Sequence, residues 1–554
     1  MARLRGAPEA RVLAGIGALG AAALCALAPL PSRAAAPGTA PEGDPGNWPS
    51  YNRTLAGERF SPLDEITTSN VAKLRRVCTY TLPEVGSFQT GPLAIDGTLY
   101  FTTDEGSYAI DASRCTLKWR RHRHSATPSP LAVNRGFAYL EGRLFRGTSD
   151  AHVIALRATS GHVVWDRVLD VQGPGISLPM APIAADGRVY IGNAGGDQVG
   201  VTGHVYALDA HDGHVIWKFD VVPAAGPARE SWTNPELPVS GGAFWTSFTL
   251  DSAKGILYVP AGNPAPDFDT LDRTGDDLYA DSVIAIDAAT GHMLAYHQLV
   301  THDSHDWDVD SAPTLVTTRA GLQIIASANK DGLLSILDRA GVSAANGRAS
   351  EASPPVIPLR SQTPTTTREN VDVPLSRDFQ IHFCPGIGGG TEWNGAAYSP
   401  LTDSLFVGAV DLCSRVQLVR KLTVPPHGTV WFGSTTAMLD IPDPAARARG
   451  WLTAYDAENG RVRWKFEAPH PMLAGVTPTA GGLVFAADLG GELYAFDEQT
   501  GRVLWRTDTG QSMGGGIVTY RAKRRQLVAV ASGMKSFAWP GSASKSRILV
   551  YGLR

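Results

Sequence analysis

Apolar and polar residues alternate in a short phrase that recurs along the chain. Each copy has an alternating segment, a turn with Asp and usually Gly, and a second segment that often ends on Trp. Alternation on both sides of such a turn is typical of a β-hairpin. The copies are YAIDASRCTLKW (108–119), IALRATSGHVVW (154–165), YALDAHDGHVIW (206–217), IAIDAATGHMLA (284–295), TAYDAENGRVRW (453–464) and YAFDEQTGRVLW (494–505), with a degenerate one at LSILDRAG (334–341).

A second hairpin pattern precedes most copies, for example PIAADGRVYIG (182–192) and TAGGLVFAAD (479–488). Four strands per unit, repeated along the chain, predict an all-β fold, a β-propeller whose blades bury their faces against their neighbours. No long helical period is present, which argues against α-solenoids and parallel α/β folds. We expect the recurring Trp to dock one blade on the next.

The length of the chain indicates the number of blades. Without the first 36 residues, eight blades would have about 65 residues each and six would need about 86. The smaller value suits a blade with loops, so we expect eight. The last strand, RILVYGL (547–553), should pair with the N-terminal part of the propeller and close the ring.

The first 36 residues have the layout of a secretory signal peptide. Arg3, Arg5 and Arg11 precede an apolar run over 12–30, and small residues follow at 34–36. A membrane anchor is the alternative, because the run approaches the length of a span. We expect cleavage near Ala36, export to the periplasm, no stable membrane span afterwards, and a single propeller domain over 37–554.

Composition and charge narrow the possible functions. The chain is 43% hydrophobic and 18% charged, which excludes a disordered or collagen-like protein. Its formal net charge is −4, so nothing indicates nucleic acid as a partner.

Four cysteines remain after the signal peptide, and none forms a CxxC pair, which argues against a metal cluster or covalently attached haem. An even number in an oxidising compartment favours two disulfides. Three pairings are possible, and free buried thiols are an alternative. We favour the nearest neighbours, Cys78 with Cys115 and Cys384 with Cys413, because each pair closes a short loop.

Three segments break the repeat with polar residues and are candidates for chemistry. They are THDSHDWDVDSAPTL (301–315), AGNPAPDFD (261–269) and GNAGGDQVGVTGHVY (192–206). Carboxylate and amide oxygens without cysteine are the ligands of a hard cation such as calcium. Solvated acidic loops are the simpler alternative interpretation of the same residues.

From residue 51 onward the chain resembles the pyrroloquinoline quinone (PQQ)-dependent alcohol dehydrogenases, eight-bladed quinoproteins of the bacterial periplasm. The motifs that carry the resemblance are YNRTLAGERFSPLDEITTSNVAKLRRV (51–77), VNRG (133–136), GGAFWTSFTLD (241–251), GNPAP (262–266), HDWDVD (305–310), ANKDG (328–332) and CPGIGGGTEWNGAAYSP (384–400).

The resemblance implies a role for individual residues. Asp308 matches the active-site carboxylate, which acts as the general base. The implied metal ligands are Asp197, Asn263, Asp308 and Asp310, with Gln198 as the alternative to Asp197. Asp310 is the additional acid of the lanthanide-dependent branch, so the ion is calcium or a lanthanide. The implied PQQ contacts are Gln89, Arg135, Ala194, Gly195, Gly196, Trp245, Lys330, and Glu392 or Asn394.

The expected function follows from this resemblance. The chain would oxidise a small-molecule alcohol to an aldehyde or ketone with PQQ and a bound metal ion. It has no CxxCH motif, so electrons would pass to an external acceptor such as a cytochrome c. The chain departs from many members at Ser129 and Pro130, where those members have adjacent cysteines, and at Gln89, where they have Glu. The competing hypothesis is a non-enzymatic periplasmic propeller that serves as a binding or assembly scaffold.

Overall fold

The computed structural model describes residues 44–127, 131–170, 173–343, 354–435, 448–536 and 544–553. By internal contacts the chain divides into Met1–Ala40 and Pro41–Arg554, and only the second unit contains described residues. The predicted signal peptide and the Ser129–Pro130 position therefore lie outside the described residues. Within the described ranges, no helix is both long enough and apolar enough to cross a membrane.

The unit is built from eight four-stranded antiparallel sheets in an eight-bladed propeller arrangement, which confirms the predicted fold class. The sheets are β2–β5 (Leu93–Ile95, Thr98–Thr102, Gly106–Asp111, Leu117–His122), β6–β9 (Ala138–Leu140, Arg143–Gly147, His152–Arg157, Val163–Val168), β10–β13 (Ile183–Ala185, Arg188–Gly192, His204–Asp209, Val215–Asp220), β14–β17 (Thr249–Asp251, Ile256–Pro260, Ser282–Asp287, Met293–Gln298), β18–β21 (Thr314–Thr317, Gln323–Ala328, Leu333–Asp338, Leu359–Pro364), β23, β24, β26 and β27 (Ala397–Ser399, Ser404–Asp411, Arg449–Asp456, Val462–Ala468), β28–β31 (Thr477–Thr479, Leu483–Ala487, Glu492–Asp497, Val503–Asp508), and β32–β34 with β1 (Ile517–Ala522, Arg525–Ser532, Arg547–Gly552, Arg75–Thr81).

Four smaller elements of the described chain lie outside the blades. A 3₁₀ turn, η1 (Val71–Lys73), precedes β1, and one short helix, α1 (Pro227–Glu230), follows β13. Strands β22 (Ile381–Phe383) and β25 (Ser414–Val416) pair as a separate two-stranded sheet.

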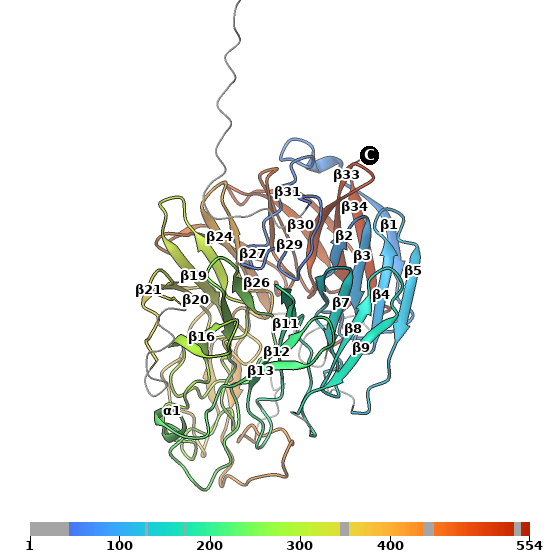
Figure 1. The fold of residues 1–554 in the computed structure, drawn as a ribbon. Coiled ribbons are helices and arrows are strands. Elements are labelled where there is room, and N and C mark those ends of the chain that lie inside the picture. The colour runs from blue at the N-terminus through green and yellow to red at the C-terminus, as the bar shows by residue number, and fades with distance from the viewer. Residues whose placement is uncertain are drawn as a thin grey trace, which may run out of the picture. The chain divides into compact units, whose positions relative to one another are not determined.

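The last blade joins the two ends of the described chain. β1 pairs antiparallel with β34, from Arg75 opposite Gly552 to Thr81 opposite Arg547. In Figure 1 the blue β1 accordingly lies beside the red β34. The predicted closure of the ring by the final strand is confirmed, because the eighth sheet is complete only when both ends of the chain contribute to it.

The recurring Trp docks one blade on the next at four places in the described structure, as the repeat predicted. The Trp165 indole, at the end of one hairpin, donates to the Ala210 carbonyl in the turn of the following blade. In the same turn Gly213 has a φ of +80°, and a Cβ there would lie 2.7 Å from the Trp165 ring. A larger residue at this glycine would be both strained and in collision with the indole. The same arrangement joins Trp119 to Gly161, Trp217 to Gly291 and Trp464 to Gly501.

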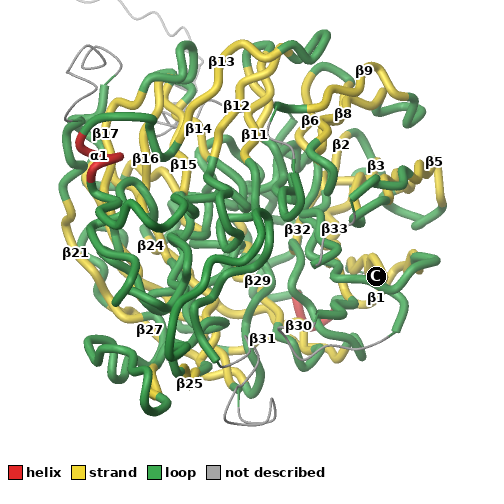
Figure 2. Tube along the Cα trace, turned by 90° about the horizontal axis from the view of Figure 1, so that it is seen from below, coloured by secondary structure: helices red, strands yellow, loops and turns green. Residues whose placement is uncertain are grey.

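Loops between the strands occupy the middle of the propeller, with the strands around them (Figure 2). Four of these loops matter for the site: 193–203 between β11 and β12, 261–281 between β15 and β16, 299–313 between β17 and β18, and 329–332 between β19 and β20. The site segments predicted from the sequence therefore lie in the connections between strands, where the strand repeat does not determine their residues.

Both predicted disulfides are present. Cys78 of β1 bonds to Cys115 in the turn between β4 and β5, which links the closing blade to the first blade. Cys384, directly after β22, bonds to Cys413, directly before β25. The nearest-neighbour pairing is confirmed, and each bond holds together segments 37 and 29 residues apart.

Loss of either disulfide is expected to destabilise the propeller. Loops of this size correspond to about 3–4 kcal/mol of unfolding free energy if the bond acts by constraining the unfolded chain. We expect the paired substitution Cys78→Ser with Cys115→Ser to lower the denaturant midpoint, measured by fluorescence. A midpoint equal to that of the parent protein would show that β-strand pairing alone holds the closure.

Candidate functional site

The loops enclose a cavity of about 230 Å³ in which most of the predicted site residues meet. They come from eight parts of the chain that are separate in sequence. The predicted residues that line it are Gln89, Arg135, Ala194, Gly195, Gly196, Asp197, its alternative Gln198, Trp245, Asn263, Asp308, Lys330 and Glu392. Asn394 and Asp310 are not among the lining residues.

Asn394 and Glu392 were alternatives for one position, and the structure places them differently. The Asn394 amide donates to the carbonyls of Leu473 and Gly514 and accepts from the Tyr51 hydroxyl. Its polar atoms are thus occupied in holding loops together. Glu392 lines the cavity instead, and burial raises the pKa of its carboxyl to about 7.

Asp308 is held by three donors. The Lys330 ammonium donates to its Oδ2 at 2.9 Å, while the Trp245 indole and the Asn263 backbone N–H both donate to Oδ1 at 3.1 Å. Gly262 permits the last contact, because a Cβ there would lie 2.3 Å from Asp308 Oδ1. The carboxylate is therefore fixed at the wall of the cavity in one orientation.

The Gly-rich loop places Asp197, and not Gln198, toward the other acids. The side-chain amide nitrogen of Gln198 faces the carbonyls of Gly175 and Gly195 and donates to each of them at 2.7 Å. Gly195 makes the turn with a φ of +113°. Burial, together with the charge of Asp308, raises the pKa of Asp197 to about 6.

Two acids that the sequence analysis did not single out complete the cluster. Carboxylate oxygens of Asp197, Asp267 and Asp306 lie within 4.8 Å of one another. Asp306 also forms an ion pair with Lys330 at 3.1 Å. Both acids belong to segments that were already candidates for a hard cation, AGNPAPDFD and THDSHDWDVD, but the spacing within a loop does not tell which acids converge.

The charges of the site are strongly coupled. Burial, followed by the neighbouring carboxylates, raises the pKa of Asp267 and of Asp310 well above the usual range of an aspartate. Burial alone would lower the pKa of Lys330, but Asp306 and Asp308 outweigh it and the pKa is raised. Acids thus outnumber cations in a buried volume, a condition that a bound multivalent ion would relieve.

Aromatic rings and a guanidinium form another part of the lining. The Arg135 guanidinium carbon lies 4.7 Å from the centre of the Trp245 ring and 5.0 Å from that of Trp393. Burial lowers the pKa of Arg135 to about 10. Trp393 was not predicted as a site residue, although its place in TEWNG, between Glu392 and Asn394, was a signal for it.

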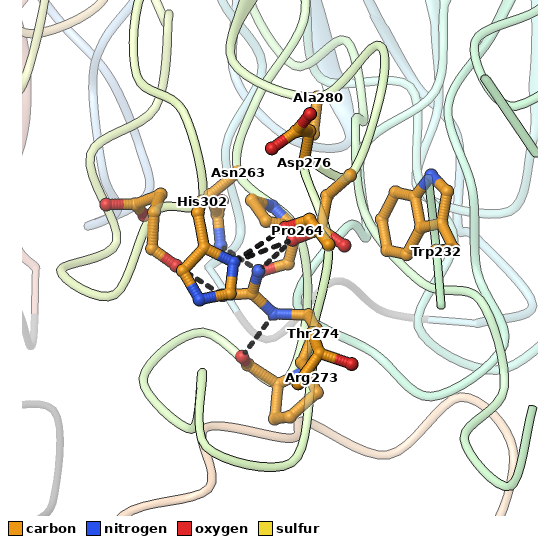
Figure 3. Close-up of polar contacts among 12 residues, drawn as sticks. Trp232, Asn263, Pro264, Arg273, Thr274, Asp276, Ala280 and His302 are labelled. Carbon is orange, nitrogen blue, oxygen red and sulfur yellow. Dashed lines mark hydrogen bonds and ion pairs between the residues drawn. The ribbon is translucent and has the colours of Figure 1, made fainter. Parts of the chain in front are cut away.

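A buried arginine fixes the two loops that carry the acids (Figure 3). Arg273 donates to the Pro266 carbonyl at 3.1 Å, pairs with Asp277, and donates to the Asp303 carbonyl. The Asp303 carboxylate in turn accepts from the backbone N–H groups of His305 and Trp307. The positions of Asp267 and Asp306 therefore depend on contacts between two loops that are separate in sequence.

The two histidines of the loop 299–313 contact other parts of the protein and not the cavity. His302 shares a hydrogen bond of 2.6 Å with the Gly275 carbonyl, and both His302 and Arg273 are labelled in Figure 3. His305 stacks on Trp307 with ring centres 4.1 Å apart. Burial lowers the pKa of His305 to about 4, so it is a neutral packing residue at neutral pH.

The model of a known enzyme family matches just over half of the chain. The family model described as PQQ glucose/ethanol/alcohol dehydrogenase, β-propeller domain, matches residues 48–341. The chain belongs to this family. The family membership inferred from the motifs is confirmed. A second model, described as outer membrane protein assembly factor BamB, matches only residues 448–538.

Individual relatives of this quinoprotein family are similar over most of their length. The quinohemoprotein alcohol dehydrogenase ADH IIB of Pseudomonas putida is 29% identical, with 96% of this chain and 81% of the relative covered. A lanthanide-dependent methanol dehydrogenase of Methylacidiphilum fumariolicum is 26% identical, with 89% and 85% covered. A solved structure titled europium-containing methanol dehydrogenase has a TM-score of 0.79 at 24% identity and covers 92% of this chain and 99% of its own. The last similarity supports the fold.

The residues around the cavity fit the cofactor of the family. PQQ is flat and carries three carboxylates, so it needs a planar apolar surface and cations. Trp245 and Trp393 supply planar apolar surfaces, and Arg135 and Lys330 supply the cations. Gln89 Oε1 and Arg135 Nε have no hydrogen-bond partner among the described residues, which leaves polar atoms available to a ligand at the cavity wall. The cluster of acids fits a hard metal ion.

Proposed function

We propose that this protein is a periplasmic PQQ- and metal-dependent alcohol dehydrogenase that oxidises an alcohol to an aldehyde or ketone. The observation that carries the proposal is the placement of Asp308 at the cavity wall, held by Lys330, Trp245 and Asn263. A scaffold would have no need for a buried carboxylate oriented by three donors toward a cavity. PQQ supplies the oxidant, which accepts two electrons from the alcohol carbon.

The protein residues would provide binding, orientation and proton transfer. Asp308 accepts the proton of the substrate hydroxyl as general base, because it is the carboxylate held at the wall where the cofactor residues converge. Lys330 keeps that carboxylate in place and balances its charge. Arg135 and Lys330 are suited to bind the acid groups of PQQ, and Trp245 to support its plane.

The metal ion and the electron acceptor complete the proposal. A calcium or lanthanide ion at the acid cluster would act as a Lewis acid beside the cofactor. The chain has no CxxCH sequence for haem attachment, so electrons would leave to a separate protein such as a cytochrome c. The propeller scaffold remains the competing function, because the second family model, which describes an assembly factor, matches residues 448–538. None of the predicted cofactor or metal residues lies in that segment, so its match concerns the blades and not the cavity.

Cofactor binding tests the proposal directly. Metal-free protein titrated with PQQ in the presence of Ca²⁺ or La³⁺ should bind one quinone per chain, seen by absorbance, and should then reduce an artificial dye when an alcohol is added. Trp245→Ala should weaken PQQ binding by about tenfold or more, because a stacking surface is lost. The matched control is Trp451→Ala, which removes an indole that donates to Asp411 outside the cavity.

Two results would contradict the proposed enzyme. Absence of PQQ binding by correctly folded protein with either metal would favour the scaffold function. Equal losses of affinity in Trp245→Ala and Trp451→Ala would show that the quinone does not bind in this cavity.

A further inference from the structure

Asp267 is a buried acid that the protein itself does not neutralise. Its side chain is 0% exposed, and neither carboxylate oxygen has a hydrogen-bond partner among the described residues. Its backbone is fixed, since its N–H donates to the Trp431 carbonyl and that of Phe268 donates to Phe432. The carboxylate is thus held in place by its backbone while its oxygens remain free to bind another group.

The free oxygens of Asp267 face two other acids. Its ligand atom lies within 4.8 Å of carboxylate oxygens of Asp197 and Asp306, close enough for one ion to contact all three. Asp197 and Asp306 line the cavity, whereas Asp267 does not and lies deeper. Asp306 reaches this position with a φ of +62°, a left-handed conformation that aspartate tolerates better than most residues.

Lys330 cannot neutralise these three acids. Its ammonium contacts Asp306 at 3.1 Å and Asp308 at 2.9 Å, so it is already shared between two carboxylates. Three close carboxylates that share one lysine with Asp308 raise the free energy of a buried site. A multivalent ion coordinated by oxygen would remove this cost, and hard cations such as Ca²⁺ or a trivalent lanthanide prefer such ligands.

We propose that Asp267 and Asp306 join Asp197 as ligands of the cation of this protein. This set differs from the one that the family resemblance implies, because it includes Asp267 and Asp306. Asp308 keeps its role as the base, because among the described residues Lys330 is the one donor on its Oδ2 and leaves that oxygen able to accept a proton. The inference deepens the proposed function, on which it rests for the role of the ion, but binding of the ion can be measured without PQQ or alcohol.

The experiment compares metal binding by two isosteric variants. Metal-free, PQQ-free protein is titrated with Tb³⁺, followed by tryptophan-sensitised luminescence, and then with competing Ca²⁺. Asp267→Asn should weaken Tb³⁺ binding by at least about tenfold, because it replaces a charged ligand by a neutral one without breaking a hydrogen bond of the protein. Circular dichroism and the melting temperature of the metal-free variants establish that they are folded.

Asp281→Asn is the matched control. Asp281 is also buried and has two oxygens without a hydrogen-bond partner in the described structure, but it does not belong to the triad or line the cavity. Its variant should bind Tb³⁺ nearly as the parent protein does. Unchanged binding in Asp267→Asn, as expected if Asp267 is a protonated structural acid, would overturn the assignment, and so would an equal loss in Asp281→Asn.

The two proposals fail in different ways. If the protein binds Tb³⁺ through Asp267 but neither binds PQQ nor oxidises alcohols, the proposed function is wrong and the metal site stands. If PQQ-dependent oxidation is present and Asp267→Asn binds Tb³⁺ normally, the enzyme stands and the metal site is wrong.

Discussion

Asp308→Asn is expected to lower PQQ-dependent alcohol oxidation by about 100-fold or more, the lower range for loss of a general base. Asparagine has the same shape but cannot accept the hydroxyl proton. It also leaves the ammonium of Lys330 with one ion pair among the described residues, that with Asp306. The measurement is dye-linked oxidation of a primary alcohol by reconstituted protein, with kcat and KM determined separately.

Asp331→Asn is the control for this variant. Asp331 follows Lys330 directly, is buried, and accepts a hydrogen bond from the Leu333 N–H, but it does not line the cavity. We expect its variant to retain most of the kcat. Turnover by folded, PQQ-loaded Asp308→Asn equal to that of the parent protein would remove Asp308 from the role of base.

Reconstitution with a lanthanide is expected to give far more activity than reconstitution with calcium. Six carboxyl groups, from Asp197, Asp267, Asp306, Asp308, Asp310 and Glu392, interact in this site with two cationic side chains, Lys330 and Arg135. A trivalent ion neutralises more of this excess negative charge than a divalent one and is the stronger Lewis acid for the quinone. The test is to load metal-free protein with PQQ and either La³⁺ or Ca²⁺ and to assay both.

Asp310 provides a way to test the origin of this preference. Both of its carboxylate oxygens lack a hydrogen-bond partner among the described residues, and it is 1% exposed. Asp310→Ala removes one uncompensated charge without removing a hydrogen bond, so it should shift the preference from La³⁺ toward Ca²⁺. Activity of the parent protein with calcium alone, or an Asp310→Ala variant with the same preference for lanthanum, would overturn the argument from charge.

The sequence by itself determined the blades and the way in which they join. A hairpin such as 206–217 depends on a period of two and a turn residue, both of which act over a few positions. The recurring Trp then predicted the contact between blades, and the structure has it at Trp165, which packs against Gly213 of the next blade. The two disulfides were also predictable, because each pair closes a short loop, and so was the closing strand, because a ring of blades needs one.

Only the tertiary structure decided which side chains meet at the centre. The sequence left Asp197 and Gln198 as alternatives, and the contacts of Gln198 with Gly175 and Gly195 distinguish them. It likewise left Glu392 and Asn394 open, until the partners of Asn394 were found at Leu473 and Gly514.

Asp267 and Asp306 are the clearest examples of what sequence patterns leave undecided. They lie in loops whose course depends on Arg273, which contacts Pro266 of one loop and Asp303 of the other. Loop side chains have no fixed period, and a single residue with positive φ, as at Asp306, changes the direction of those that follow. The site could therefore be located to three segments from the sequence, but its ligand set depends on long-range contacts that only the folded chain makes.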